Sequence, residues 1–145
     1  MTNKSSAQAN TTSQQNKQFN VVNNLALQGY DPVAYFEQNT AFKGDKKFTV
    51  SHHGIIYYFT TIEHKNKFLK SPSSYEPQFG GWCAYAMGNS GDKVEVDPET
   101  FKIVNGKLFL FYHTLINNTL KSWNKNESNL SAKAYINWSK IISKN

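Results

Sequence analysis

The segment Tyr75–Met87 reads YEPQFGGWCAYAM and combines a glycine pair with a run of large aromatic and small side chains. Two adjacent glycines, Gly80 and Gly81, permit a positive φ or a close approach between two backbone segments. The alanines that follow, Ala84 and Ala86, suit tight packing, and the aromatic side chains around them each bury a large area. We therefore expect this segment to lie at the centre of the fold.

Two β-hairpins are predicted, one on each side of this segment along the chain. The first turns at His52-His53-Gly54, between runs rich in β-branched and aromatic residues. The second turns at Asn105-Gly106, a dipeptide typical of the type I′ turn that joins hairpin strands. The predicted strands span residues 48–51, 55–59, 101–104 and 107–112.

A short helix is predicted between the first hairpin and the glycine pair. Thr60 and Glu63 have the spacing of a capping box, and the helix is expected to run through Lys70. Earlier in the chain, Asp31 and Pro32 indicate another helix start, with the aspartate as N-cap and the proline at the first helical position.

Two more helices are predicted near the C-terminus, over residues 115–124 and 130–142, where apolar residues recur near helical spacing. These elements together predict an α+β fold. In the predicted fold the two β-hairpins form a small antiparallel sheet, which packs with the short middle helix and the two C-terminal helices.

The first 20 residues are almost wholly polar and cannot bury enough surface to fold, so residues 1–20 are predicted to be a disordered tail. They also lack the apolar run of about 7–15 residues that is typical of a signal peptide. Residues 21–145 suit a single domain with one core. The sequence contains no run of roughly 18 apolar residues, so no stable membrane insertion is expected.

The net charge is +6, and all 16 basic residues are lysines. Proteins that read nucleic acids usually depend on arginine for bidentate contacts to guanine and phosphate. The lysines are also scattered rather than aligned along one face. We therefore interpret them as solvated surface and expect no nucleic-acid partner.

Cys83 is the single cysteine, so an intramolecular disulfide is impossible. Three roles are open for its side chain: a small buried apolar group, a metal ligand, or a reactive thiol. Met87 follows four residues later and shares a helix face with Cys83 if the segment is helical. With His53 and His64 these side chains form a soft ligand set that suits copper as Cu(I).

Several short motifs occur in order between Leu25 and Trp138. They are LQGYDPVAYF at 27–36, HG-x-x-Y-x-F at 53–59, F-x-x-x-P-x-x-Y at 68–75, PQFGGWCA at 77–84, DP at 97–98 and GKLFL at 106–110. With these motifs the chain resembles the YHS domain family, in particular its small, often exported bacterial branch. The resemblance implies a periplasmic or exported protein, while the sequence itself leaves a cytoplasmic location open.

Another branch of the YHS family is linked to heavy metals and carries one cysteine after its Asp-Pro-Val motif and two more near the start of the following helix. In this chain Ala34, Thr60 and His64 occupy those positions. The thiolate set of that branch is therefore absent, and His64 would be a histidine in place of a cysteine ligand.

The leading hypothesis is a non-enzymatic binding module that takes copper or a small ligand near Cys83, supported by His53, His64 or Met87. One alternative is a thiol enzyme with Cys83 as nucleophile and a histidine as its base. Another is a purely structural module for protein interactions, with an unknown protein partner. Part of the dense aromatic set is also a candidate pocket lining, with tyrosine hydroxyls as its polar points.

Overall fold

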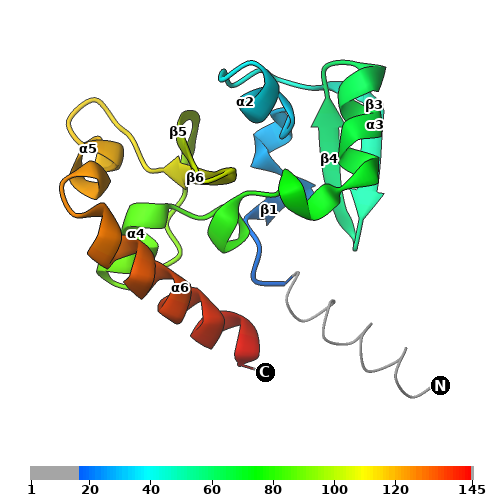
Figure 1. Cartoon of the computed structure of the whole chain (residues 1–145). Helices are drawn as coiled ribbons and strands as arrows, with labels where there is room; N and C mark the ends of the chain where they lie inside the picture. Colours follow the sequence, from blue (N-terminus) through cyan, green and yellow to red (C-terminus); the bar gives the residue numbers. More distant parts are fainter. Residues whose placement is uncertain (1–16, 145) are drawn as a thin grey trace.

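The computed structural model describes residues 17–144, which adopt an α+β fold (Figure 1). Most of the predicted disordered tail, residues 1–16, lies outside the described residues. Ordered contacts begin earlier than the expected domain start at residue 21. The backbone N–H of Asn20 donates to the carbonyl oxygen of Gly80 at 2.8 Å, and the ring of Phe19 lies 5.9 Å from that of Trp138. The apolar side chain of Phe19 thus packs against Trp138, so the last residues of the polar segment contact the domain.

The first sheet has four strands in the order β1-β2-β4-β3, and β2 pairs with β4 in parallel. Its central strand β4 alternates buried and half-buried residues, which is the pattern of a strand with one face against the core. The β3–β4 hairpin turns at His53 and Gly54, whose φ angles are +53° and +82°. The strands are β1 (Val21–Val22), β2 (Leu25–Ala26), β3 (Asp45–His52) and β4 (Ile55–Phe59).

The second hairpin consists of β5 (Asp97–Val104) and β6 (Lys107–Phe111). Asn105 and Gly106 have φ angles of +52° and +72°, so both central turn residues adopt the left-handed conformation that a type I′ turn requires. The sequence prediction of this turn is confirmed.

The α+β class is confirmed. The sequence predicts that both hairpins form one sheet, but in the structure they lie in two separate sheets. The segment around the glycine pair takes the free edge of β6 instead. Pro77 and Cys83 form isolated parallel bridges with Leu108 and Leu110 of that strand. Because this segment occupies the edge at β6, the β3–β4 hairpin does not pair with that strand.

The helices form two groups. Figure 1 shows α3 packed on β3 and β4 at one end of the molecule, while α4, α5 and α6 gather at the other. None of the helices in residues 17–144 is long and apolar enough to cross a membrane. The α-helices are α2 (Ala34–Glu37), α3 (Ile62–Lys70), α4 (Ala84–Asn89), α5 (Thr119–Asn124) and α6 (Glu127–Ser143), and the 3₁₀ helices are η1 (Leu27–Gly29), η2 (Pro72–Ser74) and η3 (Gln78–Gly81).

The start of α3 lies one residue later than the capping box predicted. Thr61, not Thr60, is the N-cap, and its hydroxyl oxygen accepts a hydrogen bond from the backbone N–H of His64 at 3.1 Å. The hydroxyl of Thr60 is already committed, because it donates to the Asp31 carboxylate at 2.7 Å. A contact from another part of the chain therefore decides which threonine caps the helix.

The helix predicted over residues 115–124 begins only at Thr119. The side chain of Asn118 caps it by accepting a hydrogen bond from the N–H of Leu120 at 3.1 Å. Leu115 and Ile116 lie instead at the tip of a tight turn, and both side chains are fully exposed. Their apolar spacing matched a helix by coincidence, since neither side chain packs against the core.

Strand β6 joins two apolar clusters. Leu108 and Leu110 point into one cluster, with the first sheet, α2 and α3, whereas Phe109 and Phe111 point into the other, with α4, α5 and α6. Both faces of β6 are thus buried. Because the segment at Pro77–Cys83 runs beside this strand, the expectation that Tyr75–Met87 lies at the centre of the fold is confirmed.

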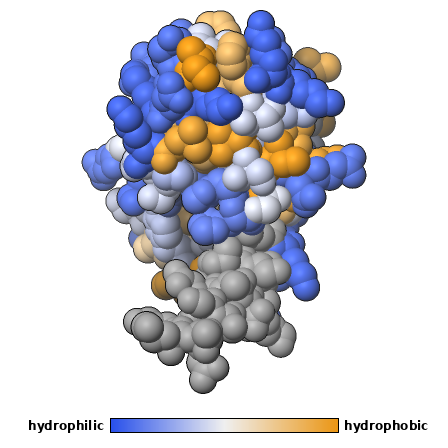
Figure 2. Space-filling view, turned by 90° about the vertical axis from the view of Figure 1, so that its right-hand side faces the viewer, coloured by the Kyte–Doolittle hydropathy of each residue, from blue (hydrophilic) through white to orange (hydrophobic). Residues whose placement is uncertain are grey.

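The outer face at the α3 end is mostly polar. Figure 2 shows this side of the molecule, where hydrophilic side chains cover most of the surface and a narrower band of hydrophobic side chains crosses it. Helix α3 itself carries two exposed apolar side chains, Ile62 and Leu69.

Candidate functional site

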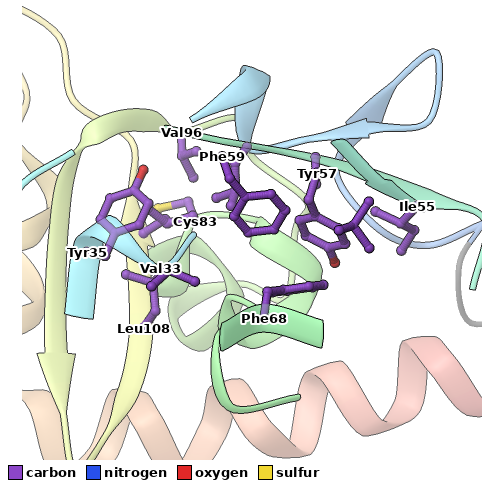
Figure 3. Packing of buried hydrophobic residues seen from close by; sticks show 13 residues of the cluster. Val33, Tyr35, Ile55, Tyr57, Phe59, Phe68, Cys83, Val96 and Leu108 are labelled. Carbon is purple, nitrogen blue, oxygen red and sulfur yellow. The ribbon is translucent and has the colours of Figure 1, made fainter. Parts of the chain in front are cut away.

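Cys83 is sealed in the core. It is the N-cap of α4, and its sulfur accepts hydrogen bonds from the backbone N–H groups of Ala86 at 3.5 Å and Tyr112 at 3.3 Å. The same sulfur lies 3.5 Å from the hydroxyl oxygen of Thr119. Figure 3 shows it among apolar side chains, beside Tyr35 and Val33. Of the three roles open from the sequence, the buried apolar group fits this environment.

The other predicted metal ligands lie in different environments. Met87 is on α4 as expected, but its side chain is buried in the second apolar cluster, whereas Cys83 belongs to the first. His64 is bound to Asp31, and His53 is in the β3–β4 turn. Among residues 17–144, no three or more His, Cys, Asp and Glu side chains form a group that could hold a metal ion. The copper site stays a prediction.

We expect the Cys83 thiol to react with iodoacetamide about a hundredfold more slowly, or slower still, in the folded protein than in concentrated urea. A thiol must be exposed and ionised to react, and this one is fully buried, so reaction must wait for the chain to open. The measurement is the alkylation rate followed by mass spectrometry. Equal alkylation rates in the two conditions would contradict the burial of Cys83 and would favour the alternative hypothesis of a thiol enzyme.

Asp31 connects the turn that precedes α2 with the start of α3. Its side chain is fully buried, and its Oδ1 accepts hydrogen bonds from the N–H groups of Val33 at 2.8 Å and Ala34 at 3.2 Å. These bonds cap the turn that leads into α2, but the N-cap residue of α2 is Val33, so the prediction of Asp31 as N-cap and Pro32 as first helical residue is wrong by two residues. Its Oδ2 accepts hydrogen bonds from the N–H and hydroxyl of Thr60 and lies 2.7 Å from His64 Nδ1. Since its oxygens are occupied by these partners, we assign Asp31 and His64 a structural role.

A cavity of about 210 Å³ lies where the first described residues, β4, the segment 73–81 and α6 meet. Most of its wall is apolar. Gly80 makes this arrangement possible, because a Cβ there would lie 2.7 Å from Trp138 Cη2 and 3.0 Å from Phe19 Cδ1. The lining residues are Phe19, Asn20, Val21, Ala26, Leu27, Tyr57, Ser73, Glu76, Pro77, Gln78, Phe79, Gly80, Gly81, Tyr135 and Trp138.

Two tyrosine hydroxyls provide polar points in this wall. The hydroxyl of Tyr57 donates to Glu76 Oε2 at 2.7 Å, and that of Tyr135 donates to Gln78 Oε1 at 2.8 Å. Burial, with the adjacent Glu76 carboxylate, raises the pKa of Tyr57, and burial raises the pKa of Tyr135. Both hydroxyls therefore keep their protons at neutral pH and hold the side chains of Glu76 and Gln78 in place.

Comparison with known proteins gave no relative: no protein-family model, no curated protein and no solved structure matches this chain. The resemblance to the YHS family therefore stays a prediction that rests on the sequence motifs alone.

The sequence predicted a pocket lined by part of a dense aromatic set, and two members of that set, Tyr57 and Phe79, line the cavity. The other three aromatic residues of the lining were not in that set: Phe19, Tyr135 and Trp138. Glu76 and Gln78 lie inside the segment that was singled out, and Gln78 belongs to the motif at 77–84, yet the sequence analysis gave neither residue a role. Their partners come from distant parts of the chain, Tyr57 on β4 and Tyr135 on α6. The one local signal was the glycine pair, since a close approach of other chain segments is a common reason for glycine.

Proposed function

We propose that this chain is a non-enzymatic binding module of the YHS type, which holds a small organic ligand in the cavity between β4, the segment 73–81 and α6. The observation that carries the proposal is the cavity itself, which combines an apolar wall with a few fixed polar groups. Ligand sites in proteins commonly have this composition. A volume of about 210 Å³ is below the roughly 300 Å³ of pockets for drug-sized ligands, so a smaller molecule suits it.

The YHS-like motif at residues 77–84 supports this location, because its first part, Pro77–Gly81, lines the cavity. The second part of the same motif contains Cys83, whose sulfur is enclosed by Ala86, Tyr112 and Thr119. A ligand in the cavity would need no rearrangement around that thiol. We therefore place the binding site at the cavity rather than at Cys83.

Isothermal titration with indole, a small apolar probe, tests the proposal. We expect saturable binding to one site, weakened about tenfold or more by Trp138→Ala, because this substitution removes one wall. Ile136→Ala is the matched control, since Ile136 lies on the same helix, is exposed and does not line the cavity. Circular dichroism of each variant checks that it is folded. Failure of indole to bind, or equal binding by Trp138→Ala, would refute the proposed site.

A further inference from the structure

We propose that the ligand of this cavity carries an alkylated ammonium group, such as a trimethylammonium head; this inference rests on the proposed function. Five aromatic side chains line the cavity together with one carboxylate, that of Glu76. The faces of aromatic rings carry negative electrostatic potential and attract cations. The five aromatic residues are Phe19, Tyr57, Phe79, Tyr135 and Trp138.

The charge of the lining favours a cation. The described chain is rich in lysine, yet no lysine or histidine lines the cavity, and Glu76 is its one charged residue among those described. Within residues 17–144 the Glu76 carboxylate takes part in no ion pair, and its hydrogen-bond partner is the neutral hydroxyl of Tyr57. A carboxylate in a mostly apolar wall is stabilised by a cation that enters the cavity.

The same lining distinguishes an alkylated ammonium from a metal ion or a primary amine. A hard metal ion needs several oxygen ligands, and one carboxylate supplies too few. A primary ammonium has three N–H donors to satisfy, and tyrosines already occupy Gln78 Oε1 and Glu76 Oε2, so Glu76 Oε1 is the one oxygen of these two side chains that accepts no tyrosine hydrogen bond. An ammonium whose hydrogens are replaced by methyl groups has no donors to satisfy, and its methyl groups pack against the rings.

The rings are fixed before any ligand enters. Tyr135 packs edge-on against Phe79 with ring centroids 4.8 Å apart, and Trp138 lies beside Phe19 at 5.9 Å. Hydrogen bonds from the Tyr57 hydroxyl to Glu76 and from the Tyr135 hydroxyl to Gln78 fix the orientation of both tyrosine rings. Side chains that are already ordered cost little entropy on binding, so a weak attraction per ring can add up to measurable affinity.

The test compares choline with 3,3-dimethylbutan-1-ol, which has the same shape but a carbon in place of the charged nitrogen. Isothermal titration is expected to give an affinity for choline about tenfold or more above that for the alcohol. Glu76→Gln is expected to weaken choline about tenfold and to change the alcohol less than about twofold. Glu99→Gln is the matched control, because this exposed carboxylate also accepts a tyrosine hydroxyl hydrogen bond but lies outside the cavity.

Each outcome separates this inference from the proposed function. Equal affinities for choline and the alcohol, or choline binding unchanged in Glu76→Gln, would overturn the ammonium inference and leave the cavity as a binding site. Indole binding without choline binding would do the same. If indole fails to bind, the proposed function is refuted, and the ammonium inference that rests on it is refuted as well.

Discussion

Replacing Asp31 with alanine is expected to lower the free energy of unfolding by about 4 kcal/mol, a large fraction of the roughly 5–15 kcal/mol by which domains are stable. The substitution removes the cap of the turn at Val33 and Ala34, which alone is worth about 1 kcal/mol. It also leaves the half-buried N–H of Thr60 and the buried ring of His64 without this partner, at about 1–3 kcal/mol for each unsatisfied group.

Urea unfolding followed by circular dichroism measures this effect. Asp31→Asn keeps an oxygen for the cap but presents an amide N–H₂ to groups that already donate, so it should be about half as destabilising. Asp45→Ala is the control, because Asp45 is exposed and accepts one hydrogen bond, from the N–H of Lys47. A loss below about 1 kcal/mol for Asp31→Ala would contradict the structural role assigned to this carboxylate.

Gly88→Ala is expected to destabilise the protein by about 3 kcal/mol, although alanine is the better helix former. Gly88 lies on α4 where this helix crosses α6. A Cβ at this position would lie 2.4 Å from the carbonyl oxygen of Leu130 and 3.2 Å from its Cα. Backbone atoms cannot move aside as a flexible side chain can, so the two helices must separate and lose packing against Met87 and Trp123 in the second cluster.

Thermal and urea unfolding of Gly88→Ala should show this loss directly. Gly54→Ala is the matched control, because nothing lies within 4 Å of a Cβ at Gly54. Its cost comes from the φ of +82°, at about 1–2 kcal/mol. If Gly88→Ala proved as stable as the unmodified chain, α4 and α6 would not approach as closely as the structure shows.

Elements determined by neighbouring residues could be predicted from the sequence. The strand over residues 55–59 and the Asn105-Gly106 turn match the structure because alternation and turn chemistry are local properties. The capping threonine of α3 could not be predicted, because Asp31, far away in sequence, takes the hydroxyl of Thr60. The number of sheets could not be predicted either, since it depends on which segment reaches the edge of β6.

The candidate site was harder to predict than the fold. Residue type directed attention to Cys83, His53, His64 and Met87, because soft ligands are recognisable in a sequence. The cavity is built from ordinary aromatic residues, and its only charged residue among those described is a glutamate. Rings of Phe19 and Trp138 meet across Gly80 from opposite ends of the described chain. The spacing of residues along the sequence does not predict which distant side chains come into contact.

The position of a bound ligand tests the central claim most directly. With the protein saturated by choline, we predict nuclear Overhauser effects between the choline methyl protons and the ring protons of Tyr57, Tyr135 and Trp138. These three rings belong to two distant segments and come together only at the cavity. Effects confined to other parts of the protein, or none to these rings at saturation, would contradict the assignment of this cavity as the binding site.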